Sequence, residues 1–113
     1  MIARIWRGAV RSSDGDRYVR YIEETGIAEY KACPGNRGAW LLSRDLGDGR
    51  TEILTLSFWE SRDSIREFAG EDIERAVFYP DDDRYLLERD LTVSHYEITE
   101  SPAPDGTQAG DPS

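Results

Sequence analysis

The tripeptide Gly47-Asp48-Gly49 restricts the fold of this chain more than any other feature of its sequence. It separates two runs with the composition of β-strands, residues 38–46 and 52–59, and a Gly-Asp-Gly sequence in that position is typical of a hairpin turn. Apolar side chains alternate along the second run, because successive residues of a strand point to opposite faces. One face carries Leu54, Leu56 and Phe58, and the other carries Ile53, Thr55, Ser57 and Trp59.

A strand and a helix are predicted before this hairpin. Residues 2–10 are short, aromatic and β-branched, which favours a strand. Ser13 or Asp14 can cap a helix that runs to about Ala32, with Tyr18, Val19 and Ile22 on its apolar side. Gly26 lowers helix propensity by about 1 kcal/mol relative to alanine, so a kink or break is expected there.

A second helix and a last strand are predicted after the hairpin. Ser61 is a favourable cap for a helix that Gly70 ends, and a further helical turn or two is expected over residues 72–77. Residues 91–99 have the composition of a strand. Beyond them, residues 100–113 are Pro, Gly, Asp, Ser and Gln with little to bury, which predicts a disordered tail.

The resulting order is strand, helix, strand, strand, helix, strand, which is the split βαβ pattern of a ferredoxin-like α+β sheet. We therefore expect one domain over residues 1–99, with both helices on one face of the sheet. The opposite face would expose leucine and aromatic side chains to water, so a partner is expected to cover it. Two such sheets facing each other would form a dimeric α+β barrel, and two-fold homodimers are the commonest oligomers.

Charge and composition exclude several classes of partner. The net charge of −9 argues against binding to nucleic acid or to an anionic membrane surface, since both require cations. No apolar run has the length of a membrane span, and the N-terminus does not read as a signal peptide, so a cytoplasmic location is the default. The single cysteine, Cys33, excludes an intramolecular disulfide and is read as a partly buried structural thiol.

Three segments resemble the antibiotic-biosynthesis-monooxygenase type of domain, a group within the dimeric α+β barrel superfamily. They are the strand-to-helix junction over residues 54–61, followed by Ile65 and Phe68, the opening residues 1–6 and the turn over residues 33–38. The resemblance extends over residues 1–99. It implies a pocket between sheet and helices in each subunit. It also implies oxygenation of phenolic or polycyclic substrates with dioxygen, without flavin, metal or haem; a related branch degrades haem.

The functional residues of that family are matched only in part. Trp59 corresponds to a tryptophan used in some of these oxygenases, whereas the accompanying asparagine is replaced by Thr55 and the histidine of the following helix by Phe68. A threonine hydroxyl can replace part of the hydrogen bonding of the asparagine amide. Without the helix histidine no axial iron ligand is evident, so the resemblance predicts no haem and no other cofactor.

The remaining candidates have both functional and ordinary structural interpretations. His95 is the only histidine, and it could act as a general base or simply form a hydrogen bond across the sheet. Tyr79 is a second candidate for proton transfer. Arg4 could bind an anionic oxygen or form a salt bridge. Asp81-Asp82-Asp83 lacks the spaced ligands of a calcium loop, so no metal site is predicted.

The residues predicted to bind substrate share aromatic or hydrogen-bonding side chains: Arg4, Trp6, Thr55, Ser57, Phe68, Phe78 and Tyr85. The aromatic members could equally be ordinary core. The leading hypothesis is a cofactor-independent monooxygenase acting on a small aromatic or polyketide-like substrate, with Trp59, His95 and Tyr79 as catalytic residues. One alternative is a non-catalytic dimer, either ligand-binding or stress-associated, that uses the same pocket for a small hydrophobic molecule. Another is a cofactor-free isomerase or cyclase.

Overall fold

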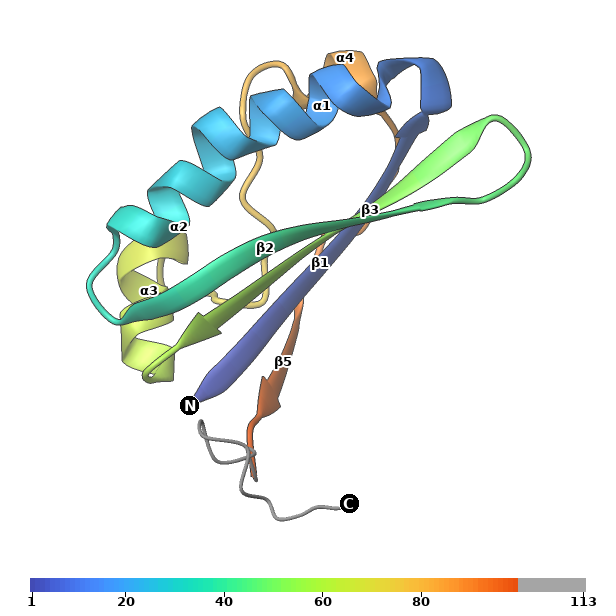
Figure 1. The fold of residues 1–113 in the computed structure, drawn as a ribbon. Helices are drawn as coiled ribbons and strands as arrows, with labels where there is room; N and C mark the ends of the chain where they lie inside the picture. Colours follow the sequence, from blue (N-terminus) through green and yellow to red (C-terminus); the bar gives the residue numbers. More distant parts are fainter. Residues whose placement is uncertain (100–113) are drawn as a thin grey trace.

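A computed structural model describes residues 1–99 as one antiparallel sheet with helices on a single face (Figure 1). The predicted disordered tail lies outside the described residues. The strands are β1 (Ile2–Arg11), β2 (Asn36–Asp45), β3 (Arg50–Trp59), β4 (Leu86–Arg89) and β5 (Ser94–Glu97). Their order is β2-β3-β1, with β4 and β5 one after the other on the free edge of β1. This confirms the ferredoxin-like α+β fold.

The helix between β1 and β2 is one continuous arm across the sheet (Figure 1). It comprises η1 (Ser12–Asp14), α1 (Gly15–Ile22), the π-helical turn η2 (Glu23–Ile27) and α2 (Ala28–Ala32). The interruption expected at Gly26 is therefore a π-helical turn rather than a break. The Thr25 hydroxyl donates a hydrogen bond to the Tyr21 carbonyl at 2.8 Å, just where the helix widens.

The second helical region is shorter. Helix α3 (Arg62–Ala69) begins as predicted at Ser61, whose hydroxyl accepts a hydrogen bond from the Ser64 N–H at 3.2 Å. It ends at Gly70, which has a φ of +90° that favours glycine. Helix α4 (Asp82–Tyr85) is a single turn that precedes β4. No helix in residues 1–99 is long and apolar enough to cross a membrane.

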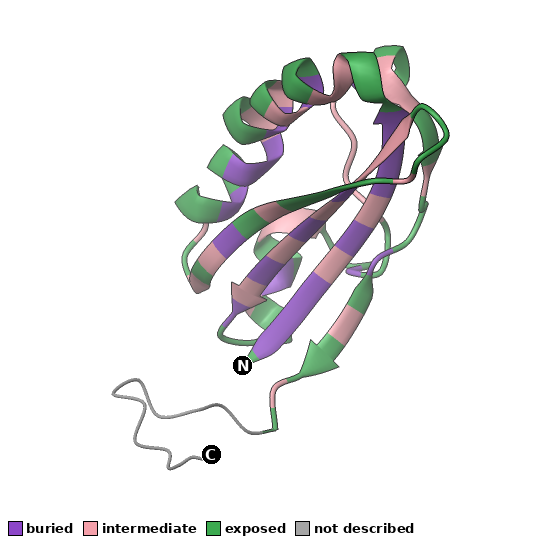
Figure 2. Ribbon diagram, turned by 45° about the vertical axis from the view of Figure 1, so that its right-hand side comes forward, coloured by how far each residue is buried: buried purple, intermediate pink, exposed green. Residues whose placement is uncertain are grey.

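The hydrophobic core lies between the helices and one face of the sheet. Buried residues alternate along β3, and β1 is buried over most of its length (Figure 2). Its members include Ile2 and Val10 of β1, Ile53 and Trp59 of β3, and Tyr18, Ile22, Ile27, Tyr30 and Ile65 of the helices. The face of β3 that carries Ile53, Thr55, Ser57 and Trp59 is thus the face covered by helices.

The helical turn predicted over residues 72–77 is wrong. Residues 72–75 form a single turn, in which the Arg75 N–H donates to the Asp72 carbonyl at 3.2 Å, and no helix follows. The segment pairs with residues 91–93 instead. The Ala76 N–H donates to the Leu91 carbonyl at 2.9 Å, and the Val93 N–H donates to the Glu74 carbonyl at 2.8 Å. Because these backbone groups find partners far away in the sequence, no helix is needed to satisfy them.

The last strand is also different from the prediction of one strand over residues 91–99. Within that range only β5 forms, and it is shorter than predicted, whereas β4 precedes the range and was not predicted. The interruption between the two strands lies at Asp90, whose N–H donates to the Arg7 carbonyl at 2.9 Å and whose carbonyl accepts from the Trp6 indole N–H at 2.8 Å. The sequence of β4, Leu-Leu-Glu-Arg, consists of good helix formers, so local propensity gave no sign of a strand.

The opposite face of the sheet is uncovered by any helix and is apolar over much of its area. We call its apolar side chains the open-face patch: Ala3, Ile5, Trp40, Leu42, Leu54, Leu56, Phe58 and Tyr96. Trp40, Leu42 and Tyr96 are exposed by 52%, 44% and 56%. The Trp40 ring packs edge-on against Phe58, with ring centroids 5.5 Å apart.

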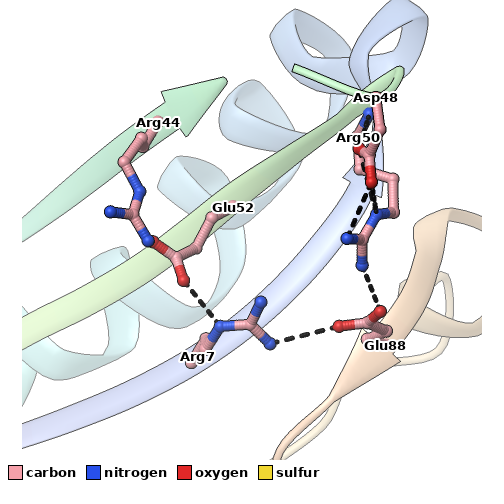
Figure 3. Close-up of polar contacts among 6 residues, drawn as sticks. All are labelled: Arg7, Arg44, Asp48, Arg50, Glu52 and Glu88. Atoms are coloured by element: carbon pink, nitrogen blue, oxygen red, sulfur yellow. Dashed lines mark hydrogen bonds and ion pairs between the residues drawn. The ribbon is translucent and has the colours of Figure 1, made fainter. Parts of the chain in front are cut away.

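Charged side chains occupy the hairpin end of the same face (Figure 3). Glu52 accepts a hydrogen bond from Arg7 at 2.6 Å and forms an ion pair with Arg44 at 3.0 Å. Arg7 also reaches Glu88, which in turn pairs with Arg50. The hydrogen bond from Arg7 holds the pKa of Glu52 below its usual range. The open face is therefore divided into an apolar half and a half of paired charges.

Candidate functional site

A small cavity lies between the sheet and the helical arm. Its volume is about 20 Å³, and a cavity needs roughly 10–15 Å³ to hold one water molecule. Most of its lining is apolar or aromatic: Trp6, Tyr18, Ile22, Gly26, Tyr30, Thr55, Val77, Phe78, Tyr79, Asp82 and Val93. An aromatic ring is larger than this space, so such a ligand requires the lining side chains to move apart.

Trp6 and Phe78 form the aromatic wall of this cavity. A Cβ atom at Gly8 would lie only 2.5 Å from the Trp6 ring, so the glycine allows the indole to lie close against β1. The Phe78 ring meets Trp6 edge-on, with ring centroids 6.2 Å apart. The guanidinium group of Arg89 lies 4.8 Å from the centre of the Phe78 ring. Such a wall suits a flat, electron-rich ring.

Asp82 is the carboxyl group in the lining of this cavity, and its residue is only 2% exposed. One carboxylate oxygen accepts a hydrogen bond from the Tyr18 hydroxyl at 3.1 Å, and the other accepts from the Tyr79 N–H at 2.6 Å. Burial raises the pKa of Asp82 despite these two donors. Asp82 is not among the residues predicted from the sequence, because three consecutive acids do not reveal which one turns inward.

Tyr79 and Thr55 are the other polar groups predicted from the sequence that line the cavity. The Tyr79 hydroxyl donates a hydrogen bond to Glu29 at 2.9 Å. Burial, followed by the bond to Glu29, raises the pKa of Tyr79, so this phenol is neutral at neutral pH. Thr55 faces Trp6 across the β1–β3 pair and offers a hydroxyl at the sheet side of the cavity.

A second cluster, centred on Arg4, adjoins the cavity. The Arg4 residue is 1% exposed, and its Nη1 donates to the Ile73 carbonyl at 2.6 Å and to His95 Nε2 at 3.0 Å. Among residues 1–99 no carboxylate forms an ion pair with Arg4, so the expected salt bridge is not what holds it. Its guanidinium lies 5.9 Å from the centre of the Phe68 ring.

His95 is held as a neutral acceptor. Arginine has no acceptor atom, so Nε2 of His95 must accept and the ring proton resides on Nδ1. Burial, together with the nearby Arg4 and Arg62, lowers the pKa of His95 to about 4. The hydrogen bond that the sequence left open for His95 is thus the one to Arg4, its partner on the neighbouring strand.

Trp59 is fully buried beside this cluster. Its indole N–H donates to the Ser57 hydroxyl at 2.9 Å, and the rings of Phe68 and Tyr30 pack against it at 6.0 and 5.9 Å. Tyr30 connects the two regions, since it lines the cavity and also meets Phe68 edge-on at 4.7 Å.

The structure therefore divides the sequence-predicted site residues into three groups. Four line the cavity: Trp6, Thr55, Phe78 and Tyr79. Five belong to the neighbouring cluster: Arg4, Ser57, Trp59, Phe68 and His95. Tyr85 lies apart, packed against Tyr18 and Tyr21. Their catalytic and binding roles stay predictions.

Solved structures of other proteins share this fold. The chain is 17% identical to a candidate antibiotic biosynthesis monooxygenase from Bacillus cereus, with a TM-score of 0.65, covering 90% of this chain and 96% of that one. A similar protein from Nitrosomonas europaea gives a TM-score of 0.57 at 13% identity, covering 88% of this chain and all of that one. No protein-family model matches the chain, and the comparison with curated proteins found no match.

A haem-degrading protein has the same fold. MhuD from Mycobacterium tuberculosis, solved with two hemes in its active site, gives a TM-score of 0.61 at 16% identity, covering 91% of this chain and all of MhuD. Together these likenesses show that the chain has the fold of antibiotic-biosynthesis-monooxygenase-type proteins. At such low identities they show the fold and not the activity.

The protonation state of His95 can be measured directly, because the chain has a single histidine. We expect its NMR titration midpoint near pH 4 rather than 6.5. The unfolded chain takes up this proton near pH 6.5, so the free energy of unfolding should fall as the pH is lowered from 6.5 to 4. In His95→Gln this part of the decline should be absent. A midpoint near 6.5 in the folded protein would contradict the arrangement.

Proposed function

We propose that this protein is a cofactor-independent monooxygenase that oxidises a small aromatic or polyketide-like substrate with dioxygen. The observation that carries the proposal is the cavity between sheet and helices, which has an aromatic wall of Trp6 and Phe78 and one buried carboxylate, Asp82. The fold shared with candidate monooxygenases supports it. We also propose that residues 1–99 act as one domain and that the protein works in the cytoplasm.

The chemistry requires little of the protein beyond binding, removal of water and proton transfer. In a substrate such as an anthrone, the CH₂ between two aromatic rings becomes C=O, and the second oxygen atom of O₂ leaves as water with both hydrogens. The reaction begins when the substrate loses a proton and becomes electron-rich. Asp82 is the group in the cavity best suited to take that proton, because burial raises its pKa toward neutrality. Tyr79 and Thr55 can hold the substrate oxygen by hydrogen bonds.

Haem degradation is not supported by the residues of this chain. The cavity lining contains no histidine, and the one histidine of the sequence uses Nε2 to accept from Arg4. These residues do not fit haem, so no step is assigned to it.

A second candidate function is non-catalytic binding of a small hydrophobic ligand in the same cavity. The observation that favours it is the position of Trp59, which is fully buried with its N–H bonded to Ser57 and does not line the cavity. A cofactor-free isomerase or cyclase would use the same pocket with one proton transfer. The three alternatives differ in oxygen consumption and in product mass.

Oxygen uptake by the purified protein separates these functions. We expect uptake above the spontaneous rate with anthrone-like or quinol substrates, without added cofactor, and a product containing one oxygen atom from O₂. Saturable binding of the panel compounds without uptake would identify a binding protein. A product of unchanged mass would identify an isomerase. Either result would contradict the monooxygenase proposal.

Gly26→Ala tests whether the cavity is the reaction site. A Cβ atom at Gly26 would lie 3.5 Å from the Tyr79 ring, an ordinary contact, and would occupy part of the cavity. We expect kcat/KM to fall about tenfold, since one methyl group in a pocket has effects of that size. The free energy of unfolding should stay the same or rise by up to about 1 kcal/mol.

Gly15→Ala is the matched control for this variant. Gly15 begins α1, and a Cβ atom there would meet nothing within 4 Å. It should increase helix stability to a similar extent and leave oxygen uptake unchanged. Unchanged uptake in Gly26→Ala would exclude the cavity as the reaction site.

We also propose that the open-face patch pairs with a second copy of the chain as a homodimer. The patch is apolar, and three of its side chains, Trp40, Leu42 and Tyr96, are more than 40% exposed. An apolar sheet face of this kind is costly to leave in water. The paired charges of Arg7, Glu52 and Glu88 border it and would lie at the rim of the interface.

Sedimentation velocity tests the dimer with two lysine substitutions. Leu42→Lys places a charge within the open-face patch, and we expect it to weaken association at least about tenfold. Leu91→Lys is the control, because Leu91 is 69% exposed and lies outside the strands of the sheet. A wild-type protein that sediments as a monomer at high concentration would contradict the proposal.

A further inference from the structure

Arg4 is a buried cation without a counter-charge. Nη1 donates to the Ile73 carbonyl at 2.6 Å and to His95 Nε2 at 3.0 Å, and Nη2 donates to the Arg75 carbonyl at 3.4 Å. Nε is buried and has no hydrogen-bond partner among the described residues. All the acceptors it does have are neutral.

Such an arrangement is unfavourable unless a negative charge completes it. An arginine side chain remains protonated in proteins, and the burial of a charge is costly unless the charge is paired. The carbonyl groups and the imidazole satisfy hydrogen bonds but do not neutralise the charge. Burial accordingly lowers the pKa of Arg4, with only the neighbouring Tyr30 acting in the opposite direction.

Arg4 does not line the cavity itself but lies in the cluster next to it. Arg4 and Trp6 are alternate residues of β1 on the helix-facing side, so their backbones are about 7 Å apart along the strand. Tyr30 lines the cavity and contacts Phe68, and the Arg4 guanidinium lies over that ring. The segment that binds Arg4 through Ile73 and Arg75 continues directly into the residues that cover the cavity.

We propose that the cavity takes an aromatic ligand with an anionic oxygen, a carboxylate or a phenolate, and that Arg4 is the counter-charge for that oxygen. This inference rests on the proposed function for the cavity as the ligand site. It names the class of ligand: the ring lies against Trp6 and Phe78, and the anionic oxygen points along β1 toward Nε of Arg4. A chain with a net charge of −9 repels anions in general, so a buried cation is what allows one to bind.

His95 is a positioning residue in this scheme. Its neutral Nε2 fixes the guanidinium without neutralising it, and its low pKa keeps it neutral at physiological pH. A carboxylate in the same place would form an ion pair with Arg4 and compete with the ligand.

Benzoate and benzamide are the matched probes, since they have nearly the same shape and differ in charge. Each probe is titrated into the wild-type protein in a calorimeter at pH 7.5. The dissociation constant of benzoate should be at least about tenfold lower than that of benzamide, as expected for a charge-assisted hydrogen bond. Benzoate should also raise Tm more than benzamide at equal concentration. Equal affinities, or tighter binding of benzamide, would overturn the inference without any variant.

Substitutions then test which arginine supplies the positive charge that binds benzoate. Arg4→Met should remove the preference for benzoate, whereas Arg89→Met, which removes the cation beside Phe78, should retain it. If Arg4→Met does not fold, His95→Asp serves instead: it should weaken benzoate more than tenfold and leave benzamide unchanged. A preference that survives in both Arg4→Met and His95→Asp, or that is lost in Arg89→Met alone, would overturn the role of Arg4.

The outcomes separate this inference from the proposed function. A preference for benzoate without oxygen uptake on any substrate would keep the anion site and reject the monooxygenase. Oxygen uptake with equal affinity for the two probes would keep the monooxygenase and reject the anion site.

Discussion

The burial of Arg4 is the interaction on which the rest of the structure depends. Its guanidinium binds the carbonyls of Ile73 and Arg75 and the imidazole of His95, and so ties β1 to the segment after α3 and to β5. That segment leads directly to Phe78 and Tyr79, which close the cavity. A charge placed in the core is a costly way to anchor a loop, because backbone carbonyls could be satisfied by neutral donors. The proposed role of Arg4 as counter-charge for an anionic ligand explains why a buried charge stands in this position.

The two faces of the sheet carry different sets of side chains, because successive side chains of a strand point to opposite faces. On the helix-facing side, Thr55, Ser57 and Trp59 contribute to the cavity and to the cluster around Arg4. On the other side, Leu54 and Leu56 form an apolar surface bordered by paired charges (Figure 3). A substitution on one strand therefore acts on the ligand site or on the proposed dimer, depending only on whether its position is odd or even.

Local patterns predicted the elements whose structure is determined locally. The alternation along residues 52–59, the turn at residues 47–49 and the cap at Ser61 were all sufficient to place strands and a helix. They failed over residues 72–77 and 86–89, where distant partners decide the conformation. The same limit applies to the site: the burial of Asp82, and the lack of a carboxylate near Arg4, depend on chain segments more than 60 residues away in sequence.

The central claim is that the ligand site is the cavity on the helix-facing side of the sheet. Methyl-resolved NMR of the protein titrated with anthrone tests it most directly. We expect shift changes at Ile22, Val77 and Val93, which line the cavity, and none at Leu54 or Leu56 of the open-face patch. Changes confined to the leucines, with the cavity methyl groups unaffected, would place the ligand on the wrong face and contradict the account.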